Sequence, residues 1–267
     1  MKKFLTCILC FFVILNLAAC LSPNSSSEEK KKIVVGVTPF PHKDIMEVAK
    51  GILEQQGYEL EITEFNDYVQ PNMALEDGSL DANFFQHIPY LENMNEENGL
   101  HLTWTVKIHI EPLGLYSSKI DSIDNLSDGA EIAIPNDATN EARALRLLEK
   151  FGFIKVSEGD LVTIRDITEN SKNLKFQEIE AAQLPRVLVD VDAAVINTNF
   201  AAEANLNPSK DALIIEDKDS PYANVLAVKE ENKDKAYIKA LSDALNSAEV
   251  KQYIEDNLID KGIVKAF

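Results

Sequence analysis

A stretch rich in aromatic and amide side chains, Asn83–Tyr90 (NFFQHIPY), is the part of this sequence best suited to bind a small molecule. If a strand runs through Phe85, alternation places Phe85 and His87 on one side of it. Those two residues and, one turn later, Tyr90 would then form an aromatic wall, with Tyr68 opposite. The alternative is that the phenylalanines belong to the core and that His87 caps a helix.

Polar residues that suit an amino-acid head group occur at predicted helix starts and strand ends. Arginine is scarce, and Arg143 is expected in the first turn of a helix that follows Asn136–Asn140. A cation there opposes the positive helix end at a cost of about 0.3–1 kcal/mol, and a bound carboxylate would remove that conflict. Arg146 fits a solvated helix surface better. Asn197 and Asn224 each offer a donor and an acceptor, as an α-ammonium and a carboxylate require.

The sequence offers little for catalysis. It contains no G-x-S-x-G, H-E-x-x-H, G-x-x-x-x-G-K-[ST] or G-x-G-x-x-G motif. The histidines (His42, His87, His101 and His109) are scattered along the chain, and no cysteine follows Cys20. A zinc site and a thiol nucleophile are therefore not expected. We predict a protein that is not an enzyme and needs no metal or cofactor.

Composition places the chain among globular proteins with an acidic surface. Of 267 residues, 45% are hydrophobic and 26% are charged, and 26 Lys+Arg against 44 Asp+Glu give a net charge of −18. An acidic surface repels phosphate backbones, and no basic stripe interleaved with aromatics occurs in the sequence. Nucleic acid is not an expected partner.

The N-terminus has the pattern of a processed export signal. Two lysines precede the apolar run Phe4–Leu15, which is too short to span a bilayer. Leu17–Cys20 (LAAC) then matches a bacterial lipobox, in which the cysteine is acylated. We predict a signal peptide over residues 1–19, lipidation at Cys20, and a Ser-rich tether over residues 20–32. The alternative is an ordinary signal peptide with an incidental cysteine. The lipobox predicts a chain anchored by lipid on the extracytoplasmic face of the cell membrane.

The body repeats one layout. Residues 33–57 and 131–152 each contain a β-branched or apolar strand, a turn and an amphipathic helix that stops at glycine. An Asp-Ala pair then precedes an apolar run twice, at Asp81 and at Asp192. Such pairs are common in α/β proteins, but both features in the same order favour two similar α/β lobes. Residues 101–110 alternate as a long strand, whose polar face would expose two histidines to solvent.

Two crossings between the lobes are predicted. One lies at Glu111–Tyr116 and the other at Glu216–Lys229, where Pro221 interrupts the chain. The lobes would comprise residues 33–113 plus 218–267, and residues 114–217, with two helices in the C-terminal tail. Two lobes joined by two crossover hinge segments enclose a cleft that closes on a ligand by hinge motion. The turns at the carboxyl ends of the strands should line that cleft.

At these residues the chain resembles the NlpA lipoprotein family, the methionine-binding lipoproteins of bacterial ABC importers. Seven motifs in family order carry the resemblance: LAAC, VGVTP-PH (35–42), LDANFFQHIPYL (80–91), EPLGLYS (111–117), IPNDATNEARAL (134–145), AAVINTNFA (193–201) and DSPYANV (219–225). The resemblance implies a type II periplasmic-binding-protein fold. It also implies that the protein delivers methionine, in the L- or D-form, to an importer permease and ATPase.

By motif position, the resemblance also implies roles for individual residues. Arg143 would bind the α-carboxylate, and Asn197 and Asn224 would hold the rest of the head group. An aromatic set would surround the thioether, at about 0.3–1.5 kcal/mol per sulfur–ring contact; it comprises Tyr68, Phe85, His87 and Tyr90. The family pattern is broken at Phe40 and at Glu141-Ala142, which would border the cleft and could shift ligand preference.

Two other functions fit the same residues. The chain could be a receptor for another amino acid or a Met-containing dipeptide on the same fold. It could instead be a surface lipoprotein outside transport, such as an adhesin. A receptor predicts saturable binding and closure on its ligand, whereas an adhesin predicts neither.

Overall fold

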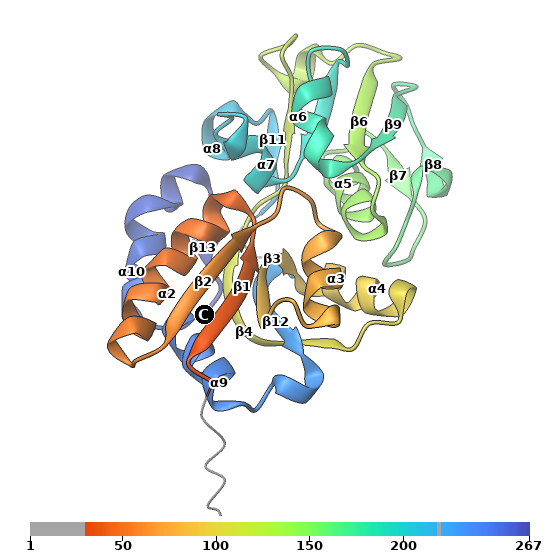
Figure 1. Ribbon diagram of the computed structural model, residues 1–267. Helices are drawn as coiled ribbons and strands as arrows, with labels where there is room; N and C mark the ends of the chain where they lie inside the picture. The colour runs from red at the N-terminus through yellow and green to blue at the C-terminus, as the bar shows by residue number, and fades with distance from the viewer. Residues whose placement is uncertain (1–29, 218–219) are drawn as a thin grey trace, which may run out of the picture. The chain divides into compact units, whose positions relative to one another are not determined.

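The computed structural model describes residues 30–217 and 220–267, and residues 31–267 form one unit. Two mixed sheets organise that unit, each covered by helices on both faces (Figure 1). This arrangement confirms the predicted two-lobed α/β fold. None of the described helices is both long and apolar enough to cross a bilayer.

The first lobe is built on a six-stranded sheet. Its strands, in spatial order, are β13 (Val264–Lys265), β4 (Leu102–Ile110), β12 (Ala223–Lys229), β3 (Ala82–His87), β1 (Lys32–Val37) and β2 (Glu59–Glu64). Strand β1 pairs in parallel with β2 and β3, whereas β12 runs antiparallel to β3 and β4. The parallel strands bring the ends of β1 and β3 to one edge of the sheet.

Five helices cover the two faces of this sheet. One face packs against α2 (Asp44–Gln55), α9 (Ala236–Leu245) and α10 (Ala248–Asn257). The other packs against α3 (Gln70–Asp77) and α4 (Ile88–Asn98). Helix α2 is amphipathic as predicted, with Ile45, Met46, Ala49 and Leu53 buried against the sheet. A short helical turn, η1 (Pro39–Lys43), joins β1 to α2.

The second lobe is built on a five-stranded sheet. Its order is β11 (Ile214–Ile215), β5 (Gly114–Tyr116), β10 (Ala193–Ile196), β6 (Glu131–Pro135) and β9 (Lys175–Ile179). Helix α5 (Ala138–Lys150) covers one face, and α6 (Leu184–Val187) and α7 (Thr198–Glu203) cover the other. Helix α8 (Pro208–Asp211) and the hairpin of β7 (Lys155–Val156) and β8 (Ile167–Glu169) complete the lobe.

The chain passes between the sheets twice. It leaves the first lobe between β4 and β5, and it returns between β11 and β12. The predicted residue limits of the lobes, 33–113 plus 218–267 and 114–217, remain a prediction. Glu111, on the first crossing, contacts His42 of the first lobe and Arg143 of the second. Glu216, on the second crossing, contacts Arg143 and Leu113.

The repeated Asp-Ala pair has the same structural role in both lobes. The Asp81 carboxylate accepts a hydrogen bond from the backbone N–H of Val34 at 2.9 Å, at the start of β1. The Asp192 carboxylate accepts one from the backbone N–H of Glu131 at 2.8 Å, at the start of β6. In each case the aspartate just before one strand, β3 or β10, pairs with a backbone N–H at the start of the parallel strand beside it, β1 or β6.

The predicted alternation of residues 101–110 fails near its end. His101 is 77% exposed, as expected, but His109 is completely buried, so its predicted solvation is wrong. The register explains this: Asn224 of β12 pairs with His109, and its neighbour Val225 pairs with Lys107. One residue of β4, Ile108, is therefore extra, and such a bulge reverses the side on which the following side chains lie.

Helix α5 also differs in two details from its predicted layout. It begins at Ala138 with Asp137 as its cap, so Arg143 lies in the second turn and not in the first. The predicted conflict with the helix dipole is correspondingly weaker, because that effect fades beyond the first turn. Phe151, which precedes the glycine at which the predicted helix stops, follows the last helical residue instead and is 44% exposed.

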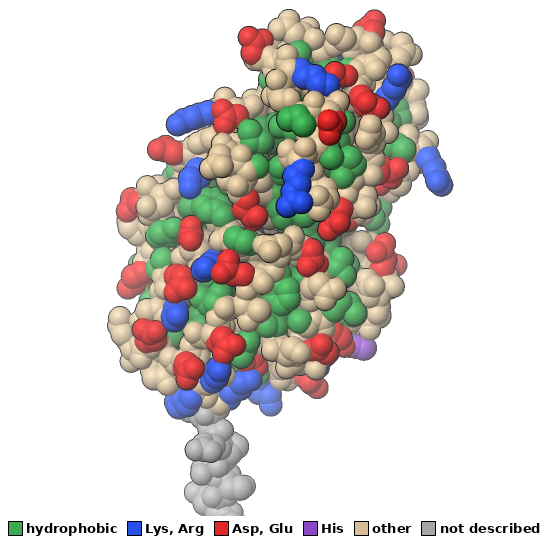
Figure 2. Space-filling model, turned by 45° about the horizontal axis from the view of Figure 1, so that its top comes forward, with side chains coloured by type: hydrophobic (Ala, Val, Ile, Leu, Met, Phe, Trp, Pro, Cys, Tyr) green, Lys and Arg blue, Asp and Glu red, His purple; other side chains and the backbone are tan. Residues whose placement is uncertain are grey.

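The surface is mixed in charge. On the face that Figure 2 shows, Asp and Glu side chains are interspersed with Lys and Arg, and no continuous basic stripe crosses it.

Candidate functional site

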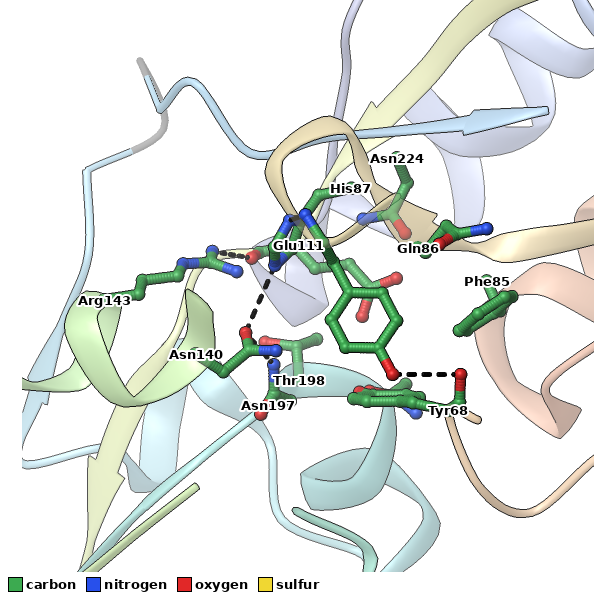
Figure 3. Close-up of a pocket in the computed structure, with 12 residues that line it drawn as sticks. Tyr68, Phe85, Gln86, His87, Glu111, Asn140, Arg143, Asn197, Thr198 and Asn224 are labelled. Carbon is green, nitrogen blue, oxygen red and sulfur yellow. Dashed lines mark hydrogen bonds between the residues drawn. The ribbon is translucent and has the colours of Figure 1, made fainter. Parts of the chain in front are cut away.

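A pocket lies where the two lobes meet, close to both crossings (Figure 3). Twelve residues line it: Tyr68, Phe85, Gln86, His87, Tyr90, Glu111, Asn140, Arg143, Asn197, Thr198, Asn199 and Asn224. The space that the centre of a water molecule can reach inside it is about 20 Å³. That is close to the room one water needs, so the side chains that line the pocket leave little free space between them.

All seven residues predicted to bind ligand line this one pocket. The first lobe contributes Tyr68, Phe85, His87, Tyr90 and Asn224, and the second contributes Arg143 and Asn197. The residues at which the family pattern is broken, Phe40 and Glu141-Ala142, do not line the pocket. Phe40 packs at the margin of the first core and Ala142 within the second, so they do not contact a ligand in the pocket directly, and the expectation that they border the cleft stays a prediction.

The aromatic residues form one continuous wall. The Tyr68 ring lies 5.7 Å from that of Phe85, 5.7 Å from that of Tyr90 and 4.9 Å from that of Phe200. The Tyr90 hydroxyl donates to the backbone oxygen of Tyr68 at 3.0 Å. A bulge places the wall: β3 has one extra residue, Phe85, between its partners on β12. Three consecutive residues, 85–87, therefore reach the pocket, which strict alternation would not allow.

His87 is both a helix cap and a pocket residue. Its Nδ1 accepts a hydrogen bond from the backbone N–H of Tyr90 at 3.1 Å, which caps α4. Its Nε2 must then carry the proton, and it lies 3.2 Å from Oδ1 of Asn140. Burial lowers the pKa of His87 to about 3, so the ring is neutral at pH 7. His87 therefore fits both interpretations that the sequence offered: it caps a helix, and it lines the pocket.

The amide groups of the second lobe are oriented by a chain of hydrogen bonds that starts at Asp137. The Asp137 carboxylate accepts from Nδ2 of Asn140 at 3.0 Å, so Oδ1 of Asn140 faces the pocket. That oxygen accepts from Nδ2 of Asn197 at 2.9 Å. As a result, Oδ1 of Asn197 is left as a buried acceptor, and among the described atoms it has no hydrogen-bond partner.

A buried donor is also left without a partner in the same pocket. Oδ1 of Asn199 accepts the Tyr68 hydroxyl at 2.6 Å, and Nδ2 of Asn199 has no partner within the described part of the chain. Unpaired buried polar atoms cost free energy, so natural proteins keep few of them. Here one acceptor, on Asn197, and one donor, on Asn199, are left without a partner among the described residues, and both residues line the same pocket.

Arg143 is held on several sides. Its Nε and Nη2 donate to the two carboxylate oxygens of Glu216 at 3.1 and 2.5 Å, and Nη2 also donates to the backbone oxygen of Glu111 at 2.7 Å. The Tyr222 ring centre lies 4.2 Å from the guanidinium carbon. The side chain is 3% exposed. These contacts fix the orientation of the guanidinium.

Arg146, one turn later, is not simply solvated. It donates to the backbone oxygens of Ser157 and Gly159 at 2.9 and 2.8 Å and to Glu149 at 2.7 Å. Its contacts lie outside the pocket and secure the loop beyond α5, which gives it a structural role.

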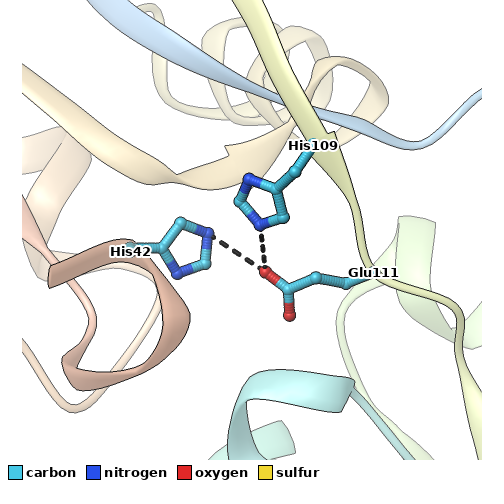
Figure 4. A group of neighbouring side chains, drawn as sticks. All are labelled: His42, His109 and Glu111. Carbon is cyan, nitrogen blue, oxygen red and sulfur yellow. Dashed lines mark hydrogen bonds and ion pairs between the residues drawn. The ribbon is translucent and has the colours of Figure 1, made fainter. Parts of the chain in front are cut away.

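Two histidines that are far apart in the sequence meet beside the pocket (Figure 4). Nε2 of His109 lies 2.7 Å from Oε1 of Glu111, and Nε2 of His42 lies 3.2 Å from the same oxygen. Thr38 Oγ1 lies 2.6 Å from Nδ1 of His42. The histidines are thus not scattered in space, which corrects the sequence-based expectation. Burial lowers the pKa of His42 to about 4 and that of His109 to about 3.

The three ligand atoms of His42, His109 and Glu111 lie within 4.8 Å of one another, close enough to be tested as a metal site. An imidazole that binds a metal through Nε2 carries its proton on Nδ1, and that proton needs an acceptor. Nδ1 of His109 is buried and has no hydrogen-bond partner in the described residues. We therefore interpret the cluster as a carboxylate held by two imidazole N–H groups.

Sequence reasoning did not select five of the pocket residues: Gln86, Glu111, Asn140, Thr198 and Asn199. Asn140 and Asn199 lie in the same turns as Arg143 and Asn197, so proximity in the sequence was a usable signal. Glu111 was assigned only to a hinge. No sequence signal points to Gln86, because the bulge in β3 turns it toward the pocket.

Comparisons with known proteins agree with this geometry. Residues 33–267 match the family described as NlpA lipoprotein. The chain is 43% identical over 258 residues to the D-methionine-binding lipoprotein MetQ of Salmonella typhi, covering 95% of this chain and 94% of that protein. It is 40% identical over 262 residues to the methionine-binding lipoprotein MetQ of Bacillus subtilis, covering 95% of both.

Solved structures agree as well. A nutrient-binding protein from Burkholderia cenocepacia bound to methionine superposes with a TM-score of 0.85 at 46% identity, covering 88% of this chain and all of that one. The methionine-binding protein MetQ superposes with a TM-score of 0.86 at 42% identity, covering 90% and 99%. These relatives are binding proteins rather than enzymes. The chain belongs to the NlpA lipoprotein family.

Proposed function

We propose that this chain is a lipid-anchored solute-binding protein that captures methionine outside the cytoplasm and delivers it to an ABC importer. One observation carries the proposal. In one small pocket, an acceptor on Asn197 and a donor on Asn199 that have no hydrogen-bond partner among the described atoms lie near the Arg143 guanidinium. An amino-acid zwitterion supplies the matching groups, because its ammonium donates and its carboxylate accepts.

The head group is proposed to bind at the polar side of the pocket. Arg143 still has its Nη1 group to offer, since its hydrogen bonds within the described part of the chain use only Nε and Nη2. Charge-assisted bonds from a guanidinium to a carboxylate are among the strongest available to a ligand. Asn197 and Asn224 lie on opposite lobes, so a head group that bonds to both favours closure of the cleft.

The methionine side chain is proposed to lie against the aromatic wall. Tyr68, Phe85, His87 and Tyr90 offer ring faces and edges, and sulfur–ring contacts contribute about 0.3–1.5 kcal/mol each. The neutral state of His87 suits an uncharged thioether. A lysine or glutamate side chain would be buried there without a partner, at a large desolvation cost.

Anchoring and delivery are proposed from the sequence and the relatives. Cys20 lies outside the described residues, and its acylation is inferred from the LAAC motif and from relatives that are named lipoproteins. An importer as partner is supported by a Coxiella burnetii relative described as an ABC transporter periplasmic substrate-binding protein, with 46% identity and a TM-score of 0.84.

Identification of the natural ligand tests the function directly. The purified protein is denatured, and the released small molecules are analysed by chiral chromatography with mass spectrometry. We expect methionine in near-stoichiometric amount, and the chiral separation distinguishes the L- from the D-form. Release of a different amino acid or of a Met-containing dipeptide would replace methionine as the ligand. If no small molecule is released and ligand-free protein binds none in calorimetry, the receptor function is wrong.

A further inference from the structure

One contact between the lobes lies outside the ligand pocket, where α8 of the second lobe meets the turn that follows α10 in the first (Figure 1). That turn is the short helix η6 (Ile259–Lys261), which ends at Gly262. Gly262 is buried and has a left-handed backbone with a φ of 82°. Because glycine has no Cβ, the backbone of the first lobe comes close to the second lobe here.

The space around this glycine is filled by the second lobe. A Cβ at this position would lie 3.1 Å from Oγ of Ser209 and 3.7 Å from both Cβ of Pro208 and Cδ1 of Ile215. The first two residues belong to α8 and the third to β11. A side chain at position 262 must therefore displace these atoms or move the two lobes apart at this point.

The strands that flank the contact are fixed to the two sides of the first crossing. Strand β13 begins two residues after Gly262 and pairs with the last two residues of β4, His109 and Ile110. Strand β11 follows α8 and pairs with the first residues of β5, Gly114 and Leu115. Between these partners the first crossing is three residues long, so the distance between η6 and α8 follows the angle between β4 and β5.

The pocket lies on the other side of that crossing. In the first sheet, β4 stands between the edge strand β13 and the strands β12 and β3 that reach the pocket. In the second sheet, β5 stands between the edge strand β11 and β10, after which Asn197 lines the pocket. Two bodies that rotate about a hinge approach each other on one side of it as they separate on the other. Opening the pocket therefore presses η6 against α8.

We propose that Gly262 and α8 form a stop that limits how far the lobes open, and that the size of residue 262 thereby sets the affinity for the ligand. Because the contact is already made in this arrangement of the lobes, a larger residue at position 262 holds the lobes apart there and favours a closed pocket. A shift toward the closed state raises the affinity of a ligand that binds this state. The statement on affinity rests on the proposed binding of methionine, whereas the stop itself does not.

The test replaces Gly262 by asparagine, which adopts a left-handed backbone more readily than most side chains do. Gly57→Asn is the matched control. Gly57 has a φ of 80°, and apart from its chain neighbours no described atom lies within 4 Å of the place of its Cβ. Both variants therefore have a similar backbone cost, but Gly262→Asn alone adds volume between the lobes.

Spin labels measure the opening directly. Val69 and Glu180 are exposed and line a cavity between the lobes, one from each lobe. No cysteine follows Cys20 in the sequence, so Val69→Cys with Glu180→Cys provides two label sites in the folded body. The distance between the labels is measured by electron resonance in the full chain, in detergent and freed of ligand. It should shorten when methionine is added, and without ligand it should be shorter in Gly262→Asn than in Gly57→Asn.

Calorimetry with methionine gives the second readout. Gly262→Asn should lower the dissociation constant by about threefold or more, and Gly57→Asn should match the wild type. Adding Ser209→Gly to Gly262→Asn removes the nearest atom of the second lobe, so it should reverse part of both changes. Circular dichroism checks that each variant folds. If Gly262→Asn does not fold, Gly262→Ala should still shorten the label distance relative to Gly57→Ala, and equal distances would overturn the stop.

The outcomes separate this inference from the proposed function. A label distance in ligand-free Gly262→Asn that is unchanged or longer would overturn the stop. An equal change in Gly57→Asn would overturn it too, because backbone strain would then be the cause. If the wild type binds no amino acid, the proposed function fails, and the label distances without ligand still decide whether the stop exists. If the label distance shortens but the dissociation constant does not fall, the role of residue 262 in affinity is wrong.

Discussion

Arg143 and Glu216 form a two-point ion pair that joins helix α5 to the segment returning toward the first lobe. Glu216 also makes two hydrogen bonds with Leu113 on the other crossing: its backbone N–H donates to the Leu113 backbone oxygen at 2.9 Å. Its carboxylate accepts from the Leu113 N–H at 3.3 Å. The guanidinium proposed to bind the ligand carboxylate is thus tied, directly or through Glu216, to both segments that join the lobes.

We expect Arg143→Ala to weaken methionine binding by about 30-fold to several thousand-fold, the loss typical of truncating one member of a buried charge pair. Arg146→Ala should leave the dissociation constant nearly unchanged, while lowering the melting temperature because it frees the loop bonded at Ser157 and Gly159. Calorimetry and thermal denaturation measure the two effects. Equal, small losses of affinity in both variants would place the carboxylate elsewhere.

Methionine should stabilise the folded protein. At about 100 times its dissociation constant, a ligand that binds only the native state adds about 2.7 kcal/mol to the free energy of unfolding, which raises the melting temperature by several degrees. Protein refolded without ligand is required, because carried-over methionine would hide the shift. Glutamate and lysine at equal concentration are the controls. Should either shift the melting temperature as much as methionine, the aromatic wall is not a thioether pocket.

The buried histidines should make stability fall in mild acid. Burial lowers the pKa of His42 to about 4 and the pKa values of His87 and His109 to about 3 in the folded state, against 6.5 for the unfolded chain. Below pH 6.5 these three histidines therefore bind protons in the unfolded state but stay neutral in the folded state. Stability is complete above pH 6.5 and is lost as the pH falls toward 4, by up to about 1.4 kcal/mol per histidine per pH unit.

The raised pKa of Glu111 opposes part of this loss, because the folded state then binds that proton more readily. Urea denaturation at a series of pH values between 7.5 and 4.5 measures the slope. His109→Gln removes one of the three groups and should make the slope shallower. Identical slopes for the wild type and His109→Gln would contradict the assignment.

Membrane attachment should depend on Cys20. Two or three acyl chains hold a protein stably on a bilayer, whereas one gives only marginal binding. Cys20→Ser should therefore either release the protein into the soluble fraction or leave an unprocessed precursor. Detergent partitioning and mass spectrometry of the product distinguish these results. Complete partitioning into detergent at the mature size would show that the lipobox interpretation is wrong.

Much of the fold follows from local pattern. Short β-branched runs, amphipathic spacing and glycine stops predict β1, α2, β6 and α5, because burial of one face forces a helix or strand to display its period in the sequence. The repeated Asp-Ala pair predicts two similar lobes, and Asp81 and Asp192 prove to accept equivalent backbone hydrogen bonds. The rule that ligands bind at strand ends then brings all seven predicted residues to one pocket.

Other features depend on contacts that no local pattern encodes. Bulges in β3 and β4 arise from pairing with β12, more than a hundred residues later, and they turn Gln86 toward the pocket and bury His109. His42 and His109 meet at Glu111 only because η1 and the end of β4 lie side by side in the folded chain. The sequence by itself determined the elements and the residue types at their ends. The tertiary structure alone decided which polar atoms are paired and which are left for a ligand, because pairing depends on long-range register and on the closing of one lobe against the other.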